Sequence, residues 1–266
     1  MNYTIMALMR QLGSGQDYAV KGTVGDVDYI AVMDGHGTGR NANKCIDLLR
    51  SYNFEEIATS ENPVDCIQRK LEPHSLLGSG STFTFARIYK SNKEIQVFNV
   101  GDSKTIVIIN GKKVYATPEH TFHNPSELQR LQGKVVVRQT MAPLPINEKT
   151  VQMIRSDTGI FPNGERLVPS QSFGHDNITG LEPSIERIHY KEEDIVRIIC
   201  GSDGFWDMYM ENYEFLNTST PDALIQIAEE RWGQQWEYYD GKKPMVTTNY
   251  GNQFDDISIA VWESFI

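Results

Sequence analysis

The sequence predicts an α+β protein, in which antiparallel β-strands and α-helices occupy separate stretches of the chain. Residues 81–116 form four short runs rich in β-branched and aromatic residues, and Asn110-Gly111 separates the last two runs. Asn-Gly between two such runs favours a tight hairpin, because both turn positions adopt positive φ. The clearest helical pattern, at residues 221–231, lies outside this meander. We therefore expect hairpin-connected strands with segregated helices, and not a parallel sheet.

The other elements follow from periodicity and turn signals along a chain without visible internal repeats. Cys45, Ile46 and Leu49 recur at helical spacing, which predicts an early helix. Residues 139–169 carry four prolines and little periodicity, and we expect a long loop or flap there. The remaining elements are expected, in chain order, as strands at 17–23 and 28–33, helices at 38–51, 63–71 and 124–131, strands at 185–190 and 195–200, a helix from about residue 205, and a last strand at 257–262. We expect a single domain over residues 1–266.

The composition narrows the class of protein. The chain has 266 residues, of which 25 are basic and 35 acidic, giving a net charge of −10. Nucleic acids and anionic membranes both attract positive surfaces, so we expect neither as a partner. The three cysteines show no close pairing motif, and the N-terminus shows no signal peptide. We expect a cytoplasmic monomer with reduced, buried thiols.

Aspartates lie at the ends of several apolar runs. Asp34, Asp102 and Asp203 each follow such a run beside a glycine, Asp255 precedes the last run, and Asp17 opens the first predicted strand. Taken singly, Asp-Gly is a common turn dipeptide. Carboxylates gathered at the ends of strands repel each other unless a cation neutralises them. Oxygen ligands of this kind suit a hard divalent ion, and the shared position therefore predicts a Mg²⁺ or Mn²⁺ site.

Several other histidine, cysteine and aromatic residues are expected to have structural and not catalytic or binding roles. His120 and His123 are interpreted as exposed loop histidines, since no third soft ligand lies nearby in the sequence. Cys200 lies inside an apolar strand, which predicts a buried and inert thiol. Four aromatic residues near the C-terminal third are expected to pack in the core and at helix edges and not to form a docking surface: Trp232, Trp236, Tyr238 and Tyr239.

Six segments of the chain together resemble the PP2C family of metal-dependent protein serine/threonine phosphatases. They occur in the family's order: Ala31–Gly37, Gly80–Thr82, Asn99–Lys104, Pro118–His120, Gly201–Asp207 and Asp255–Val261. The resemblance extends from near residue 17 to the end of the chain. It implies a sandwich of two antiparallel β-sheets flanked by α-helices, which agrees with the α+β class expected from the pattern of elements.

The resemblance also implies a site and a reaction. It implies two Mn²⁺ or Mg²⁺ ions, which Asp34 would bridge. The other ligands of these two ions would be the Gly35 carbonyl, Asp203, Asp255 and, through water, Asp17. A third, weaker ion would bind near Asp102 and Asp207. A water activated by two such cations attacks phosphorus in line, so the implied activity is hydrolysis of phosphoserine and phosphothreonine in proteins. His36 is the implied general acid for the departing seryl or threonyl oxygen.

The chain departs from the family pattern at the phosphate-binding position. Family members usually carry an arginine five residues before the first aspartate, where Leu12 stands here, so a bidentate phosphate clamp is missing. Arg10 is a weak substitute, because it would serve only after rebuilding of the segment. The family's Ser-Arg-Ala-Phe-Gly-Asp also appears as residues 170–175 without its arginine and aspartate, and Asp256 replaces an asparagine. A working phosphatase is favoured; the alternative is a weak or inactive PP2C-like protein that binds phosphoproteins or kinases.

Overall fold

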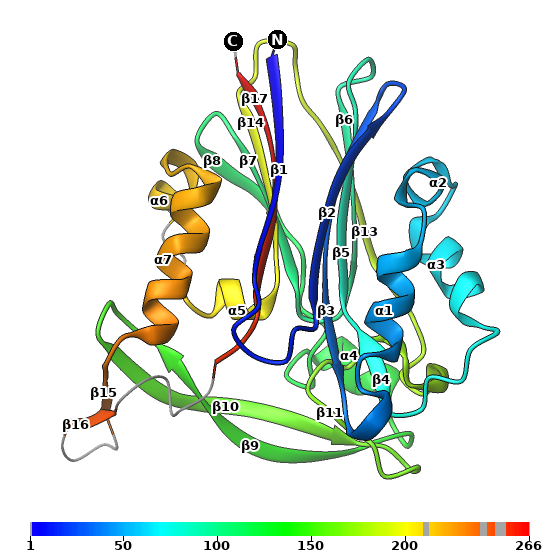
Figure 1. Ribbon diagram of the computed structural model, residues 1–266, viewed down its shortest axis with the longest axis vertical. Helices are drawn as coiled ribbons and strands as arrows, with labels where there is room; N and C mark the ends of the chain where they lie inside the picture. The colour runs from blue at the N-terminus through cyan, green and yellow to red at the C-terminus, as the bar shows by residue number, and fades with distance from the viewer. Residues whose placement is uncertain (1, 210–212, 240–243, 248–253, 266) are drawn as a thin grey trace.

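A computed structural model describes residues 2–209, 213–239, 244–247 and 254–265. Two antiparallel sheets pack face to face, and helices cover their outer faces (Figure 1). This is the predicted α+β sandwich. In the described part of the chain, no helix combines the length and apolarity that a membrane crossing needs.

The first sheet contains both ends of the chain. Its strand order is β1 (Asn2–Arg10), β17 (Ile257–Phe265), β14 (Val196–Gly201), β7 (Lys104–Ile109) and β8 (Lys112–Ala116). The second sheet has the order β12 (Phe173–Gly174), β4 (Ser79–Ser81), β3 (Val27–Gly37), β5 (Phe83–Tyr89), β6 (Glu94–Val100) and β13 (Ser184–His189), and β2 (Asp17–Val24) also pairs with β3. The meander predicted from residues 81–116 is confirmed as β5 to β8, although its last hairpin lies in the other sheet. Asn110 and Gly111 both have positive φ, as the hairpin prediction requires.

Strand alternation decides which side chains fill the space between the sheets. Along β3, Ile30 and Val32 face the other sheet, whereas Ala31 and Met33 face the helices. Ala260 and Trp262 on β17 face the same inter-sheet core, and so do Ile198 and Cys200 on β14. Cys200 is fully buried, and burial raises the pKa of its thiol to about 12, as expected for an inert cysteine.

The helices form one layer on each outer face. The second sheet is covered by α1 (Lys44–Ser51), α2 (Phe54–Thr59) and α3 (Pro63–Leu71), and the first by α5 (Asp203–Trp206), α6 (Tyr213–Thr218) and α7 (Pro221–Gly233) (Figure 1). Short 3₁₀ turns lie at Gly39–Asn41 and His175–Asn177, and α4 is Pro125–Arg130. Asn53 and Asn62 cap α2 and α3 by accepting backbone N–H bonds. Trp232 and Trp236 are buried against the first sheet, which confirms their assignment to packing.

Residues 139–169 were predicted to form a long loop or flap, but most of them lie in strands. β9 (Val136–Pro145) and β10 (Thr150–Ile160) form a long antiparallel hairpin, which extends along the lower side of the molecule in Figure 1. With β11 (Arg166–Leu167), β15 (Trp236–Tyr239) and β16 (Pro244–Thr247), it builds a third sheet. The strand β1 was not predicted from the sequence pattern.

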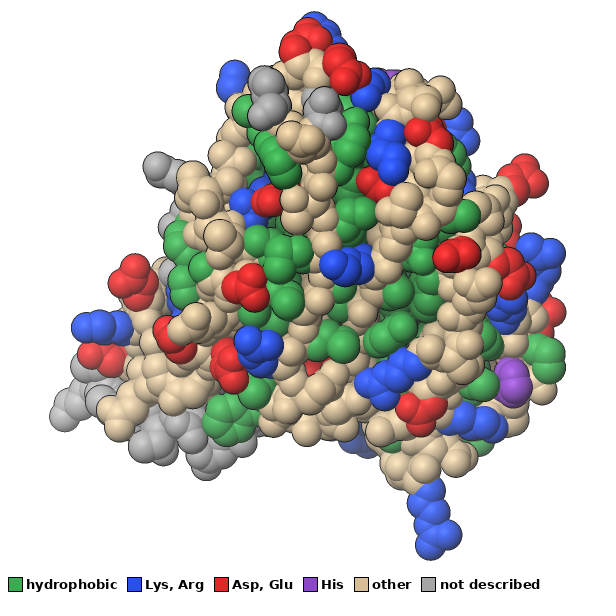
Figure 2. Space-filling model, turned by 45° about the horizontal axis from the view of Figure 1, so that its top comes forward, with side chains coloured by type: hydrophobic (Ala, Val, Ile, Leu, Met, Phe, Trp, Pro, Cys, Tyr) green, Lys and Arg blue, Asp and Glu red, His purple; other side chains and the backbone are tan. Residues whose placement is uncertain are grey.

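Charged side chains of both signs are interspersed over the face of the molecule shown in Figure 2, with hydrophobic side chains forming a band between them. Although the net charge is −10, this face is therefore not uniformly acidic. Several acidic side chains are instead gathered in a pocket, where they are buried or partly buried.

Candidate active site

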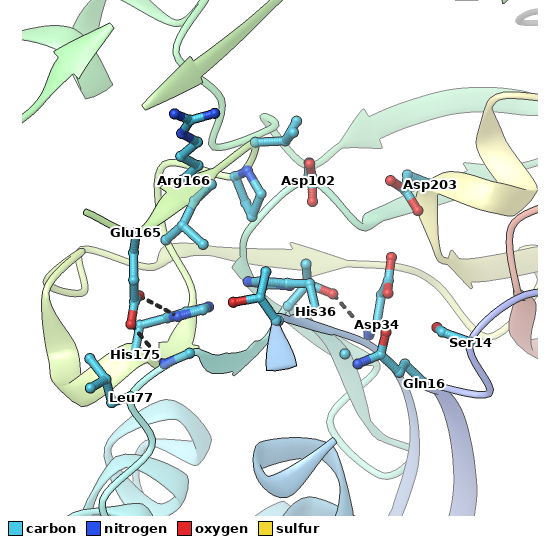
Figure 3. A pocket seen from close by; sticks show the side chains of 18 of the residues that line it. Ser14, Gln16, Asp34, His36, Leu77, Asp102, Glu165, Arg166, His175 and Asp203 are labelled. Carbon is cyan, nitrogen blue, oxygen red and sulfur yellow. Dashed lines mark hydrogen bonds and ion pairs between the residues drawn. The ribbon is translucent and has the colours of Figure 1, made fainter. Parts of the chain in front are cut away.

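A pocket of about 690 Å³ opens where the end of β3, the turn before β11 and the segment before β17 meet (Figure 3). Predicted site residues supply a large part of its lining, namely Asp34, Gly35, His36, Asp102, Asp203 and Asp255. These side chains come from elements that are far apart in the sequence. The fold therefore brings six of the predicted residues to one cavity.

Asp17 and Asp34 lie directly opposite each other in the antiparallel pair of β2 and β3. Directly opposed residues place their Cβ atoms about 5 Å apart, so two like charges here are unfavourable. Asp17 is 1% exposed, and neither of its carboxylate oxygens has a well-formed hydrogen bond within the described chain. Burial raises the pKa of Asp17 to about 7, although the hydroxyl groups of Ser258 and Ser202 oppose the shift.

Asp203 is the common neighbour of the other predicted carboxylates. Burial is the largest cause of the raised pKa of each of them, and repulsion from Asp203 contributes to every one of these shifts. The pKa of Asp255 reaches about 9, with Asp17 as a further negative neighbour. The group that shares this neighbour comprises Asp17, Asp34, Asp102, Asp207 and Asp255. Asp207 belongs to it without lining the pocket.

Local packing explains how Asp203 and Asp255 meet. β14 and β17 pair with Gly201 opposite Ile259, so the end of one strand adjoins the start of the other. The backbone N–H of Ser202 bonds to the carbonyl oxygen of Ser258 at 3.1 Å and extends this contact beyond the sheet. A Cβ atom at Gly204 would lie 2.2 Å from a backbone oxygen of the segment before β17, so only glycine permits this approach.

Hydroxyl groups fix the loops that carry Asp34 and Asp102. The hydroxyl of Thr82 accepts from the backbone N–H of Asp34 at 3.0 Å and lies 2.6 Å from the hydroxyl of Ser103. The turn that follows β6 is thereby tied to the end of β3. Gly35 packs against Gln16 and Ile46 so closely that a Cβ atom there would meet both within 3.0 Å. The glycines beside these aspartates therefore have packing reasons in addition to their turn propensity.

The carboxylate cluster fits a hard divalent cation. Clustered carboxylates that repel each other favour a proton or a cation, and neither oxygen of the buried Asp17 has a well-formed hydrogen bond among the described residues. Carboxylate and backbone oxygens are the donors that Mg²⁺ and Mn²⁺ prefer, and these ions keep several water ligands. Within the described ranges, no three Asp, Glu, His or Cys side chains already stand close enough together to form a metal-ligand set.

His36 is half-buried and lines the same pocket. Its Nε2 atom lies 2.9 Å from the hydroxyl of Ser172, and its ring stacks on that of His175 with centroids 5.1 Å apart. Burial, followed by repulsion from His175, lowers the pKa of His36 to about 3. The imidazole is therefore neutral at pH 7 in this state, and its Nε2 position is set by Ser172.

Glu165 and His175 form a pair that the sequence did not reveal. The Nδ1 atom of His175 lies 2.6 Å from a carboxylate oxygen of Glu165, and the other oxygen of Glu165 accepts from the backbone N–H of Gly78 at 2.7 Å. His175 is 1% exposed and has positive φ. It stands where the family pattern has aspartate, which marked the position as unusual, but no sequence spacing pointed to Glu165 as its partner.

The structure does not support Arg10 as a phosphate ligand. The Nε atom of Arg10 donates to Glu229 on α7 at 2.8 Å, and Arg10 does not line the pocket. Leu12 packs against the core cluster beneath α5 and α7. The following turn reaches the pocket through Ser14 and Gln16, so the arginine position of the family is adjacent to the site but is occupied by an apolar side chain.

The prediction that His120 is an exposed loop histidine is wrong. The residue is 3% exposed; its Nδ1 accepts from the backbone N–H of Gly101 at 3.1 Å, and its Nε2 lies 2.9 Å from the hydroxyl of Ser184. It therefore braces the turn beside Asp102 and is not an exposed loop residue. His123 remains partly exposed, and its Nε2 accepts from the backbone N–H of Asp157.

Two packed antiparallel sheets with a cluster of buried and partly buried carboxylates at one end define a sandwich with a candidate divalent-metal centre. A family model described as Protein phosphatase 2C matches residues 10–216. The chain belongs to the protein phosphatase 2C family. The sequence-based resemblance is thereby confirmed.

Curated relatives match most of this chain but cover a smaller share of their own. Protein phosphatase 1B of Homo sapiens is 26% identical over 222 residues, which are 71% of this chain and 42% of the relative. Probable protein phosphatase 2C member 13, mitochondrial, of Oryza sativa subsp. japonica is 27% identical over 213 residues, which are 74% of this chain and 52% of the relative. The chain spans about half the length of the curated relatives it matches.

Solved structures share the fold over nearly the whole chain. The S. agalactiae serine/threonine phosphatase aligns with a TM-score of 0.58 at 18% identity, covering 98% of this chain and 99% of the other. The catalytic domain of the phosphatase PstP in complex with two manganese ions aligns with a TM-score of 0.57 at 15% identity, covering 98% and 97%. At these identities the likeness establishes the common fold.

Proposed function

We propose that this protein is a metal-dependent phosphatase that hydrolyses phosphoserine and phosphothreonine in proteins. The observation that carries the proposal is the gathering of five carboxylates, buried or partly buried, around Asp203, because their mutual repulsion favours a cation in the pocket. Membership of the protein phosphatase 2C family and the fold shared with a manganese-bound phosphatase support the same activity.

Two Mn²⁺ or Mg²⁺ ions are proposed at the carboxylate cluster, with a third, weaker ion beside Asp102 and Asp207. Asp34, the Gly35 carbonyl, Asp203 and Asp255 would hold the two principal ions, and Asp17 would act through bound water. When bound, such ions supply an acidified water as nucleophile and offset the charge that develops on the phosphoryl group. Asp17 and Asp255 hold protons in the metal-free fold, so metal loading releases these protons and strengthens as pH rises.

His36 is proposed as the general acid. Its ring lines the pocket, where it is held by the hydroxyl of Ser172 and by stacking on His175. Its pKa of about 3 belongs to the pocket without substrate. A phosphate monoester beside the ring brings negative charge that favours the imidazolium form, which can then donate a proton to the departing seryl or threonyl oxygen.

The deciding experiment measures phosphate release from an aryl phosphate and a phosphothreonine peptide with Mn²⁺, Mg²⁺ or EDTA. Turnover should require the metal and fall by about a thousandfold or more in Asp34→Asn and Asp203→Asn, because each substitution removes an inner ligand. Asp65→Asn is the matched control, since Asp65 is an exposed carboxylate on α3. Turnover that persists in EDTA would refute the proposal.

The alternative, a PP2C-like protein that binds phosphoproteins without cleaving them, rests on the apolar Leu12 at the phosphate position. This alternative predicts a different result in the same experiment. The metal-loaded protein would then bind the phosphothreonine peptide, as measured by fluorescence anisotropy, while releasing no phosphate from either substrate.

A further inference from the structure

The described lining of the pocket contains a single lysine or arginine, Arg166. In Figure 3 it lies on the opposite side of the pocket from Asp203, and its guanidinium group is directed away from the carboxylates. Carboxylates dominate the charge of the rest of the lining. Arg166 therefore marks a local positive point on the rim of an acidic cavity.

The backbone on both sides of Arg166 is fixed. Arg166 pairs with Ile160 in the short contact between β11 and β10. Leu167 is buried in a small core cluster with Phe122, and a carboxylate oxygen of Glu165 accepts from the backbone N–H of Gly78 at 2.7 Å. Such anchoring presents the Arg166 side chain at a constant place on the rim, so little ordering of the backbone is needed when a ligand binds.

The guanidinium group is available for a ligand. Within the described ranges, the Arg166 side chain makes no hydrogen bond or ion pair, and the residue is exposed. The neighbouring carboxylate of Glu165 would be a natural partner, but its two oxygens are directed to His175 and to the backbone N–H of Gly78. An arginine without a partner beside a binding cavity can accept an anionic group in bidentate geometry.

We propose that Arg166 is a specificity-determining residue that binds an anionic group flanking the phosphoresidue of a protein substrate. The proposal rests on the phosphatase function proposed above. The scissile phosphate must reach the metal-binding carboxylates, whereas Arg166 lies across the pocket from them, so Arg166 contacts a different part of the substrate. The flanking group is a carboxylate of Asp or Glu, or a second phosphoryl group; both are anions that a guanidinium recognises.

Arg166 is the one cationic side chain in the described lining, and this gives it a selective effect. Without it, an acidic residue beside the phosphoresidue would meet no positively charged side chain there. With it, the exposed pair favours an acidic over a neutral flanking residue by about two- to fivefold, the range that surface ion pairs support. The preference should weaken at high salt, because an exposed pair is screened.

The test compares kcat/KM among phosphothreonine peptides that differ only in the flanking residues, which are glutamate, glutamine, lysine or a second phosphothreonine. Wild type, Arg166→Gln and Arg166→Glu are assayed with Mn²⁺ at low salt. Arg187→Glu is the matched control, because Arg187 is an exposed arginine on β13 outside the pocket. The measured quantity is the ratio of kcat/KM for each charged peptide to that for the glutamine peptide.

We expect the acidic-to-neutral ratio to exceed one in wild type, to disappear in Arg166→Gln, and to invert in favour of lysine in Arg166→Glu by about fivefold. The glutamate and double-phosphate arms show which anion is preferred. An unchanged ratio in Arg166→Glu overturns the proposal, as does an equal loss for all peptides, which would place Arg166 on the scissile phosphate. If no peptide is turned over, the phosphatase function fails, and fluorescence anisotropy with the same peptides then decides the role of Arg166.

Discussion

Arg10 is bound to Glu229 across the edge of the first sheet, with its Nε atom 2.8 Å from the carboxylate oxygen. This contact joins β1 to α7 and directs the guanidinium away from the carboxylate pocket. Two residues later, Leu12 packs among the side chains beneath α5 and α7. The N-terminal strand therefore uses its cation and its apolar residue for helix docking, and leaves the phosphate side of the site without an arginine.

Leu12→Arg should strengthen phosphate binding. A charge-assisted bidentate contact contributes about 1.5–3 kcal/mol, so KM for an aryl phosphate should fall by about tenfold or more. Loss of the half-buried leucine should cost about 1 kcal/mol of folding free energy. Steady-state kinetics and urea unfolding measure the two effects. Arg10→Ala is the control and should change KM less than twofold; a large rise in its KM, or an unchanged KM in Leu12→Arg, would contradict this assignment.

The stability of the metal-free protein should fall as pH rises. Asp17 and Asp255 have pKa values of about 7 and about 9 in the fold, against 3.8 for an unperturbed aspartate. Between pH 4 and pH 9 the folded state thus binds more protons than the unfolded state, and the free energy of unfolding decreases with pH. Metal ions replace those protons, so their stabilising effect should increase over the same range.

Asp255→Asn isolates this effect from other titrating groups. In EDTA its Tm should exceed that of wild type by a margin that grows from pH 5 to pH 8, reaching on the order of 3 °C. In Mn²⁺ the order should reverse, because the variant has lost a ligand. Differential scanning fluorimetry across pH measures both margins. A variant that is less stable than wild type in EDTA at pH 8 would show that the carboxylates are not under mutual repulsion.

Much of the site was predictable because its motifs are local. An aspartate after a buried strand can be recognised from a few residues, and strand pairing then brings such ends together, as Asp17 and Asp34 show. The hairpin of β9 and β10 was not predictable from pattern, because Pro143 and Pro145 read as loop signals. Both lie on β9, which pairs only with β10 among the described strands, and an edge strand tolerates proline.

The tertiary contacts that hold buried polar side chains also could not be predicted from the sequence. His120 is buried because partners from two other segments satisfy both of its ring nitrogens. The pair of Glu165 and His175 forms through a turn with positive φ, whose geometry no residue pattern encodes. Burial of a polar group depends on partners that only the tertiary fold supplies.

Asp256 should be required for the turn that precedes β2. Its two carboxylate oxygens accept from the backbone N–H groups of Gly13 and Gln16, each at 2.7 Å, and the residue is 2% exposed. Asp256→Asn replaces one acceptor with an NH₂ group that faces a donor, so the free energy of unfolding should fall by about 1–3 kcal/mol. The asparagine usual in the family is therefore not equivalent here. Urea unfolding tests this, and a variant as stable as wild type would show that relief of negative charge outweighs the lost bond.

The role proposed for His36 predicts a dependence on the leaving group. An alkoxide leaving from phosphoserine needs a proton, whereas p-nitrophenolate is stable without one, so general acid catalysis matters only for the first. His36→Gln should lower kcat for a phosphoserine peptide by about 10²–10⁴-fold and for p-nitrophenyl phosphate far less. Single-turnover kinetics on both substrates give the comparison, with the exposed His74→Gln as control. Equal losses on the two substrates would mean that His36 orients or binds the phosphoryl group, because a proton donor must distinguish a leaving group that needs its proton from one that does not.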